Sequence, residues 1–205
     1  MVDRMKTVCV LKSGGQYTAE HVRWLFSQRS GLWLWCFSDV EVPGVPTVRL
    51  RHDLPGWWSK IEVFGPAFNE DVLYLDLDSV ITGPLDDLMR AGQTTLCSDF
   101  LQPKFANSSV MYIAQDDKAR VYDRFMQDPH AHMNTYRKWP ARWGDQGFIA
   151  DCLPEAARWP QEWVRSYRVH CRDGMPEGCC VVAFHGQPKP WDIRADWIPQ
   201  IKVAA

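Results

Sequence analysis

Short, fully apolar runs alternate with amphipathic stretches along the first half of the chain. Residues 7–11, 32–37 and 72–75 are apolar at successive positions, with Thr7 as the one polar residue, which is typical of strands buried on both faces. After Thr18, a suitable helix N-cap, apolar residues recur at helical spacing up to about Gln28. Further strands are expected at 47–50, 94–97, 110–113 and 179–184, and further helices at 59–64, 83–92, 117–126 and 146–152.

The order of these elements predicts the fold class. The first half reads β-α-β-β-α-β-α-β, which favours an α/β sheet over separate all-α or all-β units. A chain of 205 residues fits a single domain, so we expect one domain over residues 1–205. The second half is rich in Pro and Trp and predicts long ordered loops, which often carry a substrate site at the edge of such a sheet.

Composition and charge exclude several classes of partner. The formal net charge is -2, which gives no electrostatic reason to expect nucleic acid or an anionic membrane as a partner. No apolar run is long enough for a transmembrane segment, and Asp3, Arg4 and Lys6 interrupt any signal-peptide core. The seven cysteines form no C-x-x-C pair, which favours buried reduced thiols and a cytoplasmic location.

Two carboxylates follow the apolar run at 72–75, in Asp76-Leu77-Asp78. On an extended backbone, residues two apart point to the same side, so both carboxylates face one site. Like charges this close are costly unless a cation lies between them, and oxygen ligands suit Mn²⁺ or Mg²⁺. Such an ion would neutralise a diphosphate and stabilise it as a leaving group. The pattern therefore predicts a metal-diphosphate site.

A phosphatase chemistry competes with this interpretation. Haloacid-dehalogenase-like phosphatases also place Asp-x-Asp after an apolar strand, with the first Asp, here Asp76, as nucleophile. In those enzymes the motif follows the first strand, whereas several elements precede Asp76 in this chain. Their late Gly-Asp-x-x-x-Asp motif is not met either, because Gly144-Asp145 is followed at the required position by Ile149. These two differences count against a phosphatase, which we keep only as an alternative.

The C-terminal stretch favours the diphosphate interpretation. In His185-Gly186-Gln187-Pro188-Lys189-Pro190-Trp191, an apolar run again leads into a polar loop. Neutral imidazole is a good third ligand for Mn²⁺, Gly permits close backbone approach to a phosphate, and Lys supplies a positive charge to it.

Three blocks together resemble glycosyltransferase family 8, the group of glycogenin and the bacterial lipopolysaccharide galactosyl- and glucosyltransferases. They are residues 74–85 with Asp76-Leu77-Asp78, then Asn107 to Met111 followed by Asp145-Gln146, and finally 185–191. The resemblance implies a GT-A fold with a Rossmann-like mixed sheet flanked by helices. It also implies retaining transfer of a hexose from a nucleotide-sugar donor, often UDP-linked, with Mn²⁺, to a sugar, glycan or other hydroxyl acceptor.

The resemblance also assigns roles to residues of this chain. It makes Asp76, Asp78 and His185 the metal ligands, with Asp76 also on the ribose. Gly186 and Lys189 would hold the diphosphate, and Tyr17 and Lys60 would contact the donor base and phosphate or sugar. The remaining expected contacts to the donor sugar come from Asn107 and Asp145, with Gln146 near the anomeric carbon.

The chain departs from the family at three positions. His185 directly precedes Gly186, whereas family members separate the two by two residues; a shift of two keeps an extended side chain on the same face. Ser109 and Gly147 replace the family's Gly and second Asp, where sugar identity and acceptor geometry are decided. A catalytically degenerate relative that binds nucleotide sugar or glycan is therefore a second alternative. The adjacent Trp57 and Trp58 are interpreted as packing residues.

Overall fold

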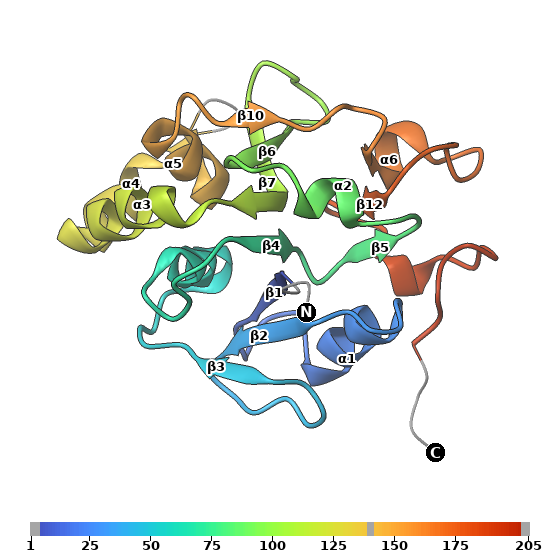
Figure 1. Ribbon diagram of the computed structural model, residues 1–205, viewed down its shortest axis with the longest axis horizontal. Helices are drawn as coiled ribbons and strands as arrows, with labels where there is room; N and C mark the ends of the chain where they lie inside the picture. Colours follow the sequence, from blue (N-terminus) through green and yellow to red (C-terminus); the bar gives the residue numbers. More distant parts are fainter. Residues whose placement is uncertain (1–4, 139–141, 202–205) are drawn as a thin grey trace.

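A seven-stranded mixed sheet forms the centre of the protein, in the order β10-β6-β7-β4-β1-β2-β3 (Figure 1). The computed structural model describes residues 5–138 and 142–201. Strands β1 to β4 run parallel to one another, β7 runs antiparallel to both β4 and β6, and β10 runs parallel to β6. The strands are β1 (Lys6–Leu11), β2 (Leu34–Ser38), β3 (Thr47–Arg49), β4 (Val72–Leu75), β6 (Thr95–Ser98), β7 (Ala106–Ile113) and β10 (Ala157–Arg158).

Two smaller sheets extend this centre. β5 (Ser79–Ile81) follows β4 directly and pairs antiparallel with β12 (Val181–Ala183), which pairs parallel with β11 (Val164–Ser166). β8 (Arg137–Lys138) pairs antiparallel with β9 (Arg142–Trp143). The pairing of β5 with β12 brings the late part of the chain next to the segment that follows β4.

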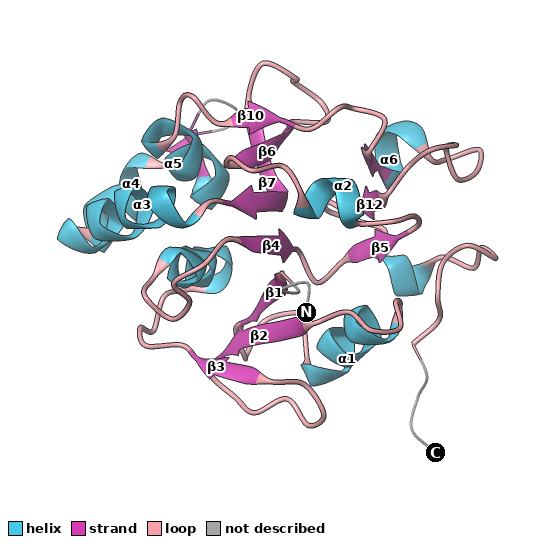
Figure 2. Cartoon of the chain, viewed as in Figure 1, coloured by secondary structure: helices cyan, strands magenta, loops and turns pink. Residues whose placement is uncertain are grey.

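Helices cover both faces of the large sheet. Helices α3, α4 and α5 lie together at one side and α1 lies beside β2 at the other (Figures 1 and 2). The helices are α1 (Ala19–Ser27), α2 (Asp86–Met89), α3 (Gln115–Gln127), α4 (Pro129–Thr135), α5 (Gly144–Cys152) and α6 (Tyr167–His170), with 3-10 helices η1 (Gly56–Phe64) and η2 (Pro190–Asp192).

Alternating side chains of the central strands build two apolar cores. In β4, Val72 and Tyr74 join the core beneath α3, α5 and η1, whereas Leu73 and Leu75 join the core beneath α1. This is the period-two alternation of a strand covered on both faces. It explains why the central strands read as uninterrupted apolar runs in the sequence.

The reversal of β7 decides which residues meet at one edge of the sheet. The carboxyl ends of β1 and β4 lie at the same edge because these strands are parallel. Since β7 is antiparallel to β4, its amino end lies there too, and the Asp76 amide donates to the Ser109 carbonyl at 2.9 Å. Residues from distant parts of the chain are thereby brought together at this edge.

The α/β class and most of the expected elements are confirmed. The strand at 72–75 matches β4, and Thr18 caps α1 as expected, with its hydroxyl accepting from the Glu20 amide. Two helix predictions were wrong in part: the helix at 59–64 is a 3-10 helix, and the helix expected over 83–92 is only the single turn of α2. Six of the seven cysteines are buried, and all seven thiols are free. Among the described residues, no helix is both long and apolar enough to cross a bilayer.

Candidate functional site

A cleft of about 390 Å³ opens at the edge where β1 and β4 end and β7 begins. This volume lies within the range of small-molecule sites, roughly 300–1,000 Å³. Eight of the ten residues selected from the sequence line it: Tyr17, Lys60, Asp76, Asp78, Asn107, Asp145, Gln146 and His185.

The other two selected residues lie beside the cleft. Lys189 is buried and its Nζ donates to Asp78 Oδ2 at 2.5 Å, so it reaches the site through that carboxylate. Gly186 has φ of +73° and does not line the cleft; a Cβ added there would lie 3.1 Å from the guanidinium of Arg168.

Asp76 is held from two sides at the end of β4. Its Oδ1 accepts a hydrogen bond from the Tyr74 hydroxyl at 2.6 Å and lies 3.1 Å from Lys60 Nζ. Burial raises the pKa of Asp76 above its ordinary value; the ammonium of Lys60 opposes this shift, and the negative charge of Asp78 adds to it. The side chain is 28% exposed, which leaves it open to the cleft.

Asp78 lies between Lys189 and Tyr17. The Tyr17 hydroxyl donates to Asp78 Oδ2 at 2.8 Å, the same oxygen atom that accepts from Lys189. Burial and then the charge of Asp78 raise the pKa of Tyr17, so its hydroxyl stays protonated at neutral pH. The ring of Tyr17 meets those of His21 and Trp191 edge-on, at centroid distances of 5.8 and 6.0 Å.

Lys60 forms ion pairs with two carboxylates of the site, Asp76 and Asp145. Its Nζ lies 2.9 Å from Asp145 Oδ2 and 3.1 Å from Asp76 Oδ1, and it donates to Ser108 Oγ at 3.0 Å. The Ser108 hydroxyl in turn donates to Asp145 at 2.7 Å. Burial alone would lower the pKa of Lys60, but Asp145 and Asp76 outweigh it and the pKa is raised. Lys60 is therefore a buried cation shared by two carboxylates.

His185 contacts a neighbouring loop as well as the cleft. Its Nε2 lies 2.7 Å from Ser166 Oγ, and its ring stacks on Phe100 with an interplanar angle of 12°. Burial and the nearby Arg168 lower the pKa of His185, so the imidazole is neutral at pH 7. A neutral imidazole can act as a metal ligand, but in this arrangement Nε2 is already engaged by Ser166.

The donor set fits a divalent cation at the two carboxylates. Asp76 Oδ2 and Asp78 Oδ1 accept no hydrogen bond from any residue that the structure describes, so both are available as hard oxygen ligands. No group of three or more His, Cys, Asp or Glu side chains within the described ranges is close enough to hold a metal. The chain thus offers two carboxylate ligands and places His185 outside a preformed triad.

The charge balance of the site also favours an added cation. Among the charged groups that meet in these ion pairs, three carboxylates (Asp76, Asp78 and Asp145) face two ammonium groups (Lys60 and Lys189). This cluster carries one net negative charge before a diphosphate adds its own. Bringing a diphosphate to it without a further cation would cost electrostatic free energy.

Two of the three departures from the family motifs, Gly147 and Ser109, lie in packed parts of the structure. A Cβ added at Gly147 would lie 3.1 Å from the Cα of Arg142, so a side chain there would require β9 to shift by a few tenths of an ångström. Ser109 is buried in β7, and its amide donates to Asn107 Oδ1 at 2.9 Å. Asn107 Nδ2 then donates to Gln146 Oε1 at 3.2 Å, which links the start of β7 to the first turn of α5.

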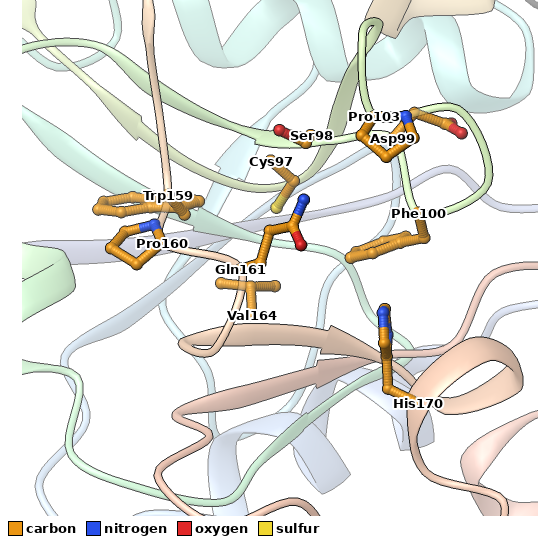
Figure 3. Close-up of a pocket in the computed structure, with 10 residues that line it drawn as sticks. All are labelled: Cys97, Ser98, Asp99, Phe100, Pro103, Trp159, Pro160, Gln161, Val164 and His170. Carbon is orange, nitrogen blue, oxygen red and sulfur yellow. The ribbon is translucent and has the colours of Figure 1, made fainter.

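A second, much smaller cavity of about 50 Å³ lies between β6, the segment after β10 and α6 (Figure 3). Phe100 reaches it from the loop after β6 and His170 from the end of α6, and Trp159 and Gln161 line it from the segment after β10. It has room for a few water molecules and no larger ligand. Phe100 also stacks on His185, so one side chain lines this cavity and contacts the cleft residue His185.

Sequence reasoning did not find the aromatic wall of the cleft. Trp58 is buried and stacks on Phe125, as a packing residue should, but Trp57 is 55% exposed and lines the cleft together with Trp143. The packing interpretation of Trp57 was therefore wrong. The 3-10 geometry of η1 turns the two neighbouring rings in different directions, a distinction that two adjacent tryptophans do not reveal in sequence.

The chain shares its fold with known glycosyltransferases. No protein-family model and no curated protein sequence matches it. Among solved structures, the glycosyltransferase GlyE of Streptococcus pneumoniae TIGR4 has a TM-score of 0.70 at 14% identity, over 91% of this chain and 56% of that one. The galactosyltransferase LgtC, in complex with donor and acceptor sugar analogues, has a TM-score of 0.60 at 12% identity, over 91% and 89%. A glycosyltransferase involved in the glycosylation of the major capsid of PBCV-1 has a TM-score of 0.53 at 9% identity, over 90% of this chain and 94% of that one.

These likenesses concern the fold. The chain spans about half the length of GlyE, the first of these neighbours, and most of the length of the other two. Identities of 9–14% say nothing about individual residues of a site. The mixed α/β sheet flanked by helices is that of a GT-A glycosyltransferase.

Proposed function

We propose that this protein is a metal-dependent glycosyltransferase that moves a hexose from a nucleotide-diphosphate sugar, UDP-linked, to a hydroxyl acceptor. The observation that carries the proposal is the cleft at the end of β4, where Asp76 and Asp78 each keep one oxygen free of hydrogen bonds to described residues. The fold shared with glycosyltransferases over nine-tenths of the chain supports the same class. The motif resemblance to family 8 adds the retaining stereochemistry to the proposal.

Different residues around the cleft would bind different parts of the donor. Asp76 and Asp78 would hold Mn²⁺ or Mg²⁺, which supplies a Lewis acid for the departing diphosphate. Lys189, which now donates to Asp78, would turn to a phosphate oxygen, and Gly186, at positive φ, leaves the backbone of its loop free of a side chain. Tyr17 would face the base, while Asn107, Asp145 and Gln146 would bind the donor sugar. His185 would be a ligand only after leaving Ser166.

The transfer step needs no covalent intermediate with the protein. The acceptor hydroxyl oxygen forms a bond to C1 of the sugar, while the bond from C1 to the phosphate oxygen breaks and its electron pair stays on the diphosphate. The hydroxyl proton passes to an oxygen of the leaving diphosphate on the same face of the sugar, so C1 keeps its configuration. In this front-face scheme the protein contributes positioning and neutralisation of charge. Lys60 forms ion pairs with both Asp145, which would meet the donor sugar, and Asp76, which would hold the metal.

A thermal-shift screen of nucleoside diphosphates, each with and without Mn²⁺, tests the donor site. A ligand present at one hundred times its Kd stabilises the native state by about 2.7 kcal/mol. For a chain of this size, that corresponds to a rise in Tm of roughly 5–10 °C. We expect the shift with UDP only when Mn²⁺ is present, and its loss in Asp78→Asn. No shift with any nucleotide would refute the donor site.

A further inference from the structure

Two exposed tryptophans stand at the mouth of the cleft. Trp57, in the first turn of η1, is 55% exposed, and Trp143, at the end of β9, is 39% exposed. Their ring centroids are 5.9 Å apart with an angle of 39° between the planes. Large aromatic side chains left in water forgo the free energy of burial, so such a pair at a cleft mouth indicates a binding surface.

The position of Trp57 is fixed by the backbone next to the proposed catalytic residues. Gly144 has φ of +58°, and a Cβ added there would lie 2.9 Å from Trp57 Nε1. The indole therefore packs directly on the residue that precedes Asp145 and Gln146. Any molecule lying on this ring would be next to the first turn of α5.

The same two rings also line an adjoining groove. This groove has a volume of about 280 Å³ and continues from the cleft past Trp57 and Trp143 toward α4. Besides the rings, it presents polar side chains that can donate or accept hydrogen bonds: His130, Asn134 and Arg137. An apolar wall with polar groups opposite it suits a pyranose, which has an apolar C–H face and a rim of hydroxyl groups.

We propose that the Trp57–Trp143 groove binds the acceptor, and that the acceptor is a glycan of at least two sugar rings. The terminal ring would place its hydroxyl in the cleft near Gln146, and the next ring would lie on the indoles. We assign the groove to the acceptor because it adjoins the donor cleft: the same pair of rings forms a wall of both. The identification of the bound glycan as the acceptor rests on the proposed function, but glycan binding in this groove can be tested without turnover.

The experiment is binding of the fluorescently labelled protein to an array of immobilised oligosaccharides. The variants are Trp57→Ala, Trp57→Phe and, as a matched control, Trp33→Ala, because Trp33 is 37% exposed but lines neither the cleft nor the groove. We expect the wild type and Trp33→Ala to bind the same glycans. Trp57→Ala should bind them at least about tenfold more weakly, the loss typical of a central aromatic contact. Trp57→Phe keeps a flat apolar ring and should stay within about threefold.

Two results would overturn the glycan site: no glycan bound by the wild type, or equal binding by the wild type and Trp57→Ala. The Tm of each variant, with and without UDP and Mn²⁺, separates the possible causes of a loss. Trp57→Ala should keep the Tm that the wild type has without ligand, because the indole is 55% exposed, and this shows that a loss of glycan binding does not come from unfolding. Glycan binding that depends on Trp57, in a protein with no nucleotide shift at all, would uphold the groove and refute the proposed transfer.

Discussion

Removal of Lys60 should destabilise the protein much more than removal of an exposed cation. In Lys60→Met, Asp76 and Asp145 would lose a counter-ion that is now 3.1 and 2.9 Å away. The side chain of Lys60 is 8% exposed, so water cannot readily replace it. A methionine of similar length fills the space but leaves the two carboxylates facing each other.

The magnitude follows from the geometry. At an effective dielectric constant of about 20, two unit charges roughly 3 Å apart attract by about 5 kcal/mol. The cost of burying the ammonium offsets part of the two attractions. Breaking a buried ion pair by removing one partner typically costs 3–5 kcal/mol. We therefore expect the free energy of unfolding to fall by about 3–5 kcal/mol at neutral pH.

Urea unfolding followed by far-UV circular dichroism measures this loss. Arg90→Met is the matched control, because Arg90 is 72% exposed and lies 3.6–3.9 Å from Asp86 and Asp87, so its removal should cost less than about 1 kcal/mol. In Lys60→Met/Asp145→Asn, the loss should be smaller than the sum of the single losses by about 1–3 kcal/mol. A loss below about 1 kcal/mol in Lys60→Met, or strictly additive losses in the double variant, would refute the electrostatic reasoning.

Three further predictions follow from other parts of the molecule. Gly144→Ala places a methyl group against Trp57 at positive φ, so it should cost about 1–2 kcal/mol of stability and weaken glycan binding on the array. Burial lowers the pKa of Lys118 to about 8 against about 10.4 unfolded, so the unfolded state binds more protons between these values. The stability of the wild type relative to Lys118→Met should therefore rise by about 2 kcal/mol from pH 8 to pH 10 in urea unfolding; parallel pH profiles would contradict this. Phe148 is fully buried, and Phe148→Ala should lower the free energy of unfolding by about 3–5 kcal/mol, whereas a loss below 1 kcal/mol would show that the core is not packed as described.

Much of the large sheet could be predicted because its strands are buried on both faces. The run at 72–75 has no polar position, and β4 occupies those residues. The helix after Thr18 was also predictable, because its capping residue and its apolar face agree. Strands of two or three residues, such as β5 and β10, carry too few positions for a period to be recognised, and their pairing depends on distant segments.

The residues of the site could be predicted from the sequence, but the ion pairs and hydrogen bonds between them could not. Asp76 and Asp78 are visible in sequence because charges directly follow an apolar run. The sequence could not show that Lys60 is shared by Asp76 and Asp145, since the antiparallel β7 brings these segments together. Nor could it show that Ser166, on the short strand β11, engages His185, or that Trp57 points outward while Trp58 packs inside. These features depend on tertiary contacts between segments far apart in the chain.

The most direct test of the central claim is the slow hydrolysis of a UDP-sugar by the protein, measured as UDP released in the presence of Mn²⁺. Water then takes the place of the acceptor, so the assay does not depend on knowing the glycan. The account predicts Mn²⁺-dependent release that is lost in Asp78→Asn and kept in Trp33→Ala. No release by the wild type, together with hydrolysis of a simple phosphomonoester that disappears in Asp76→Asn, would contradict glycosyl transfer and support a phosphatase instead.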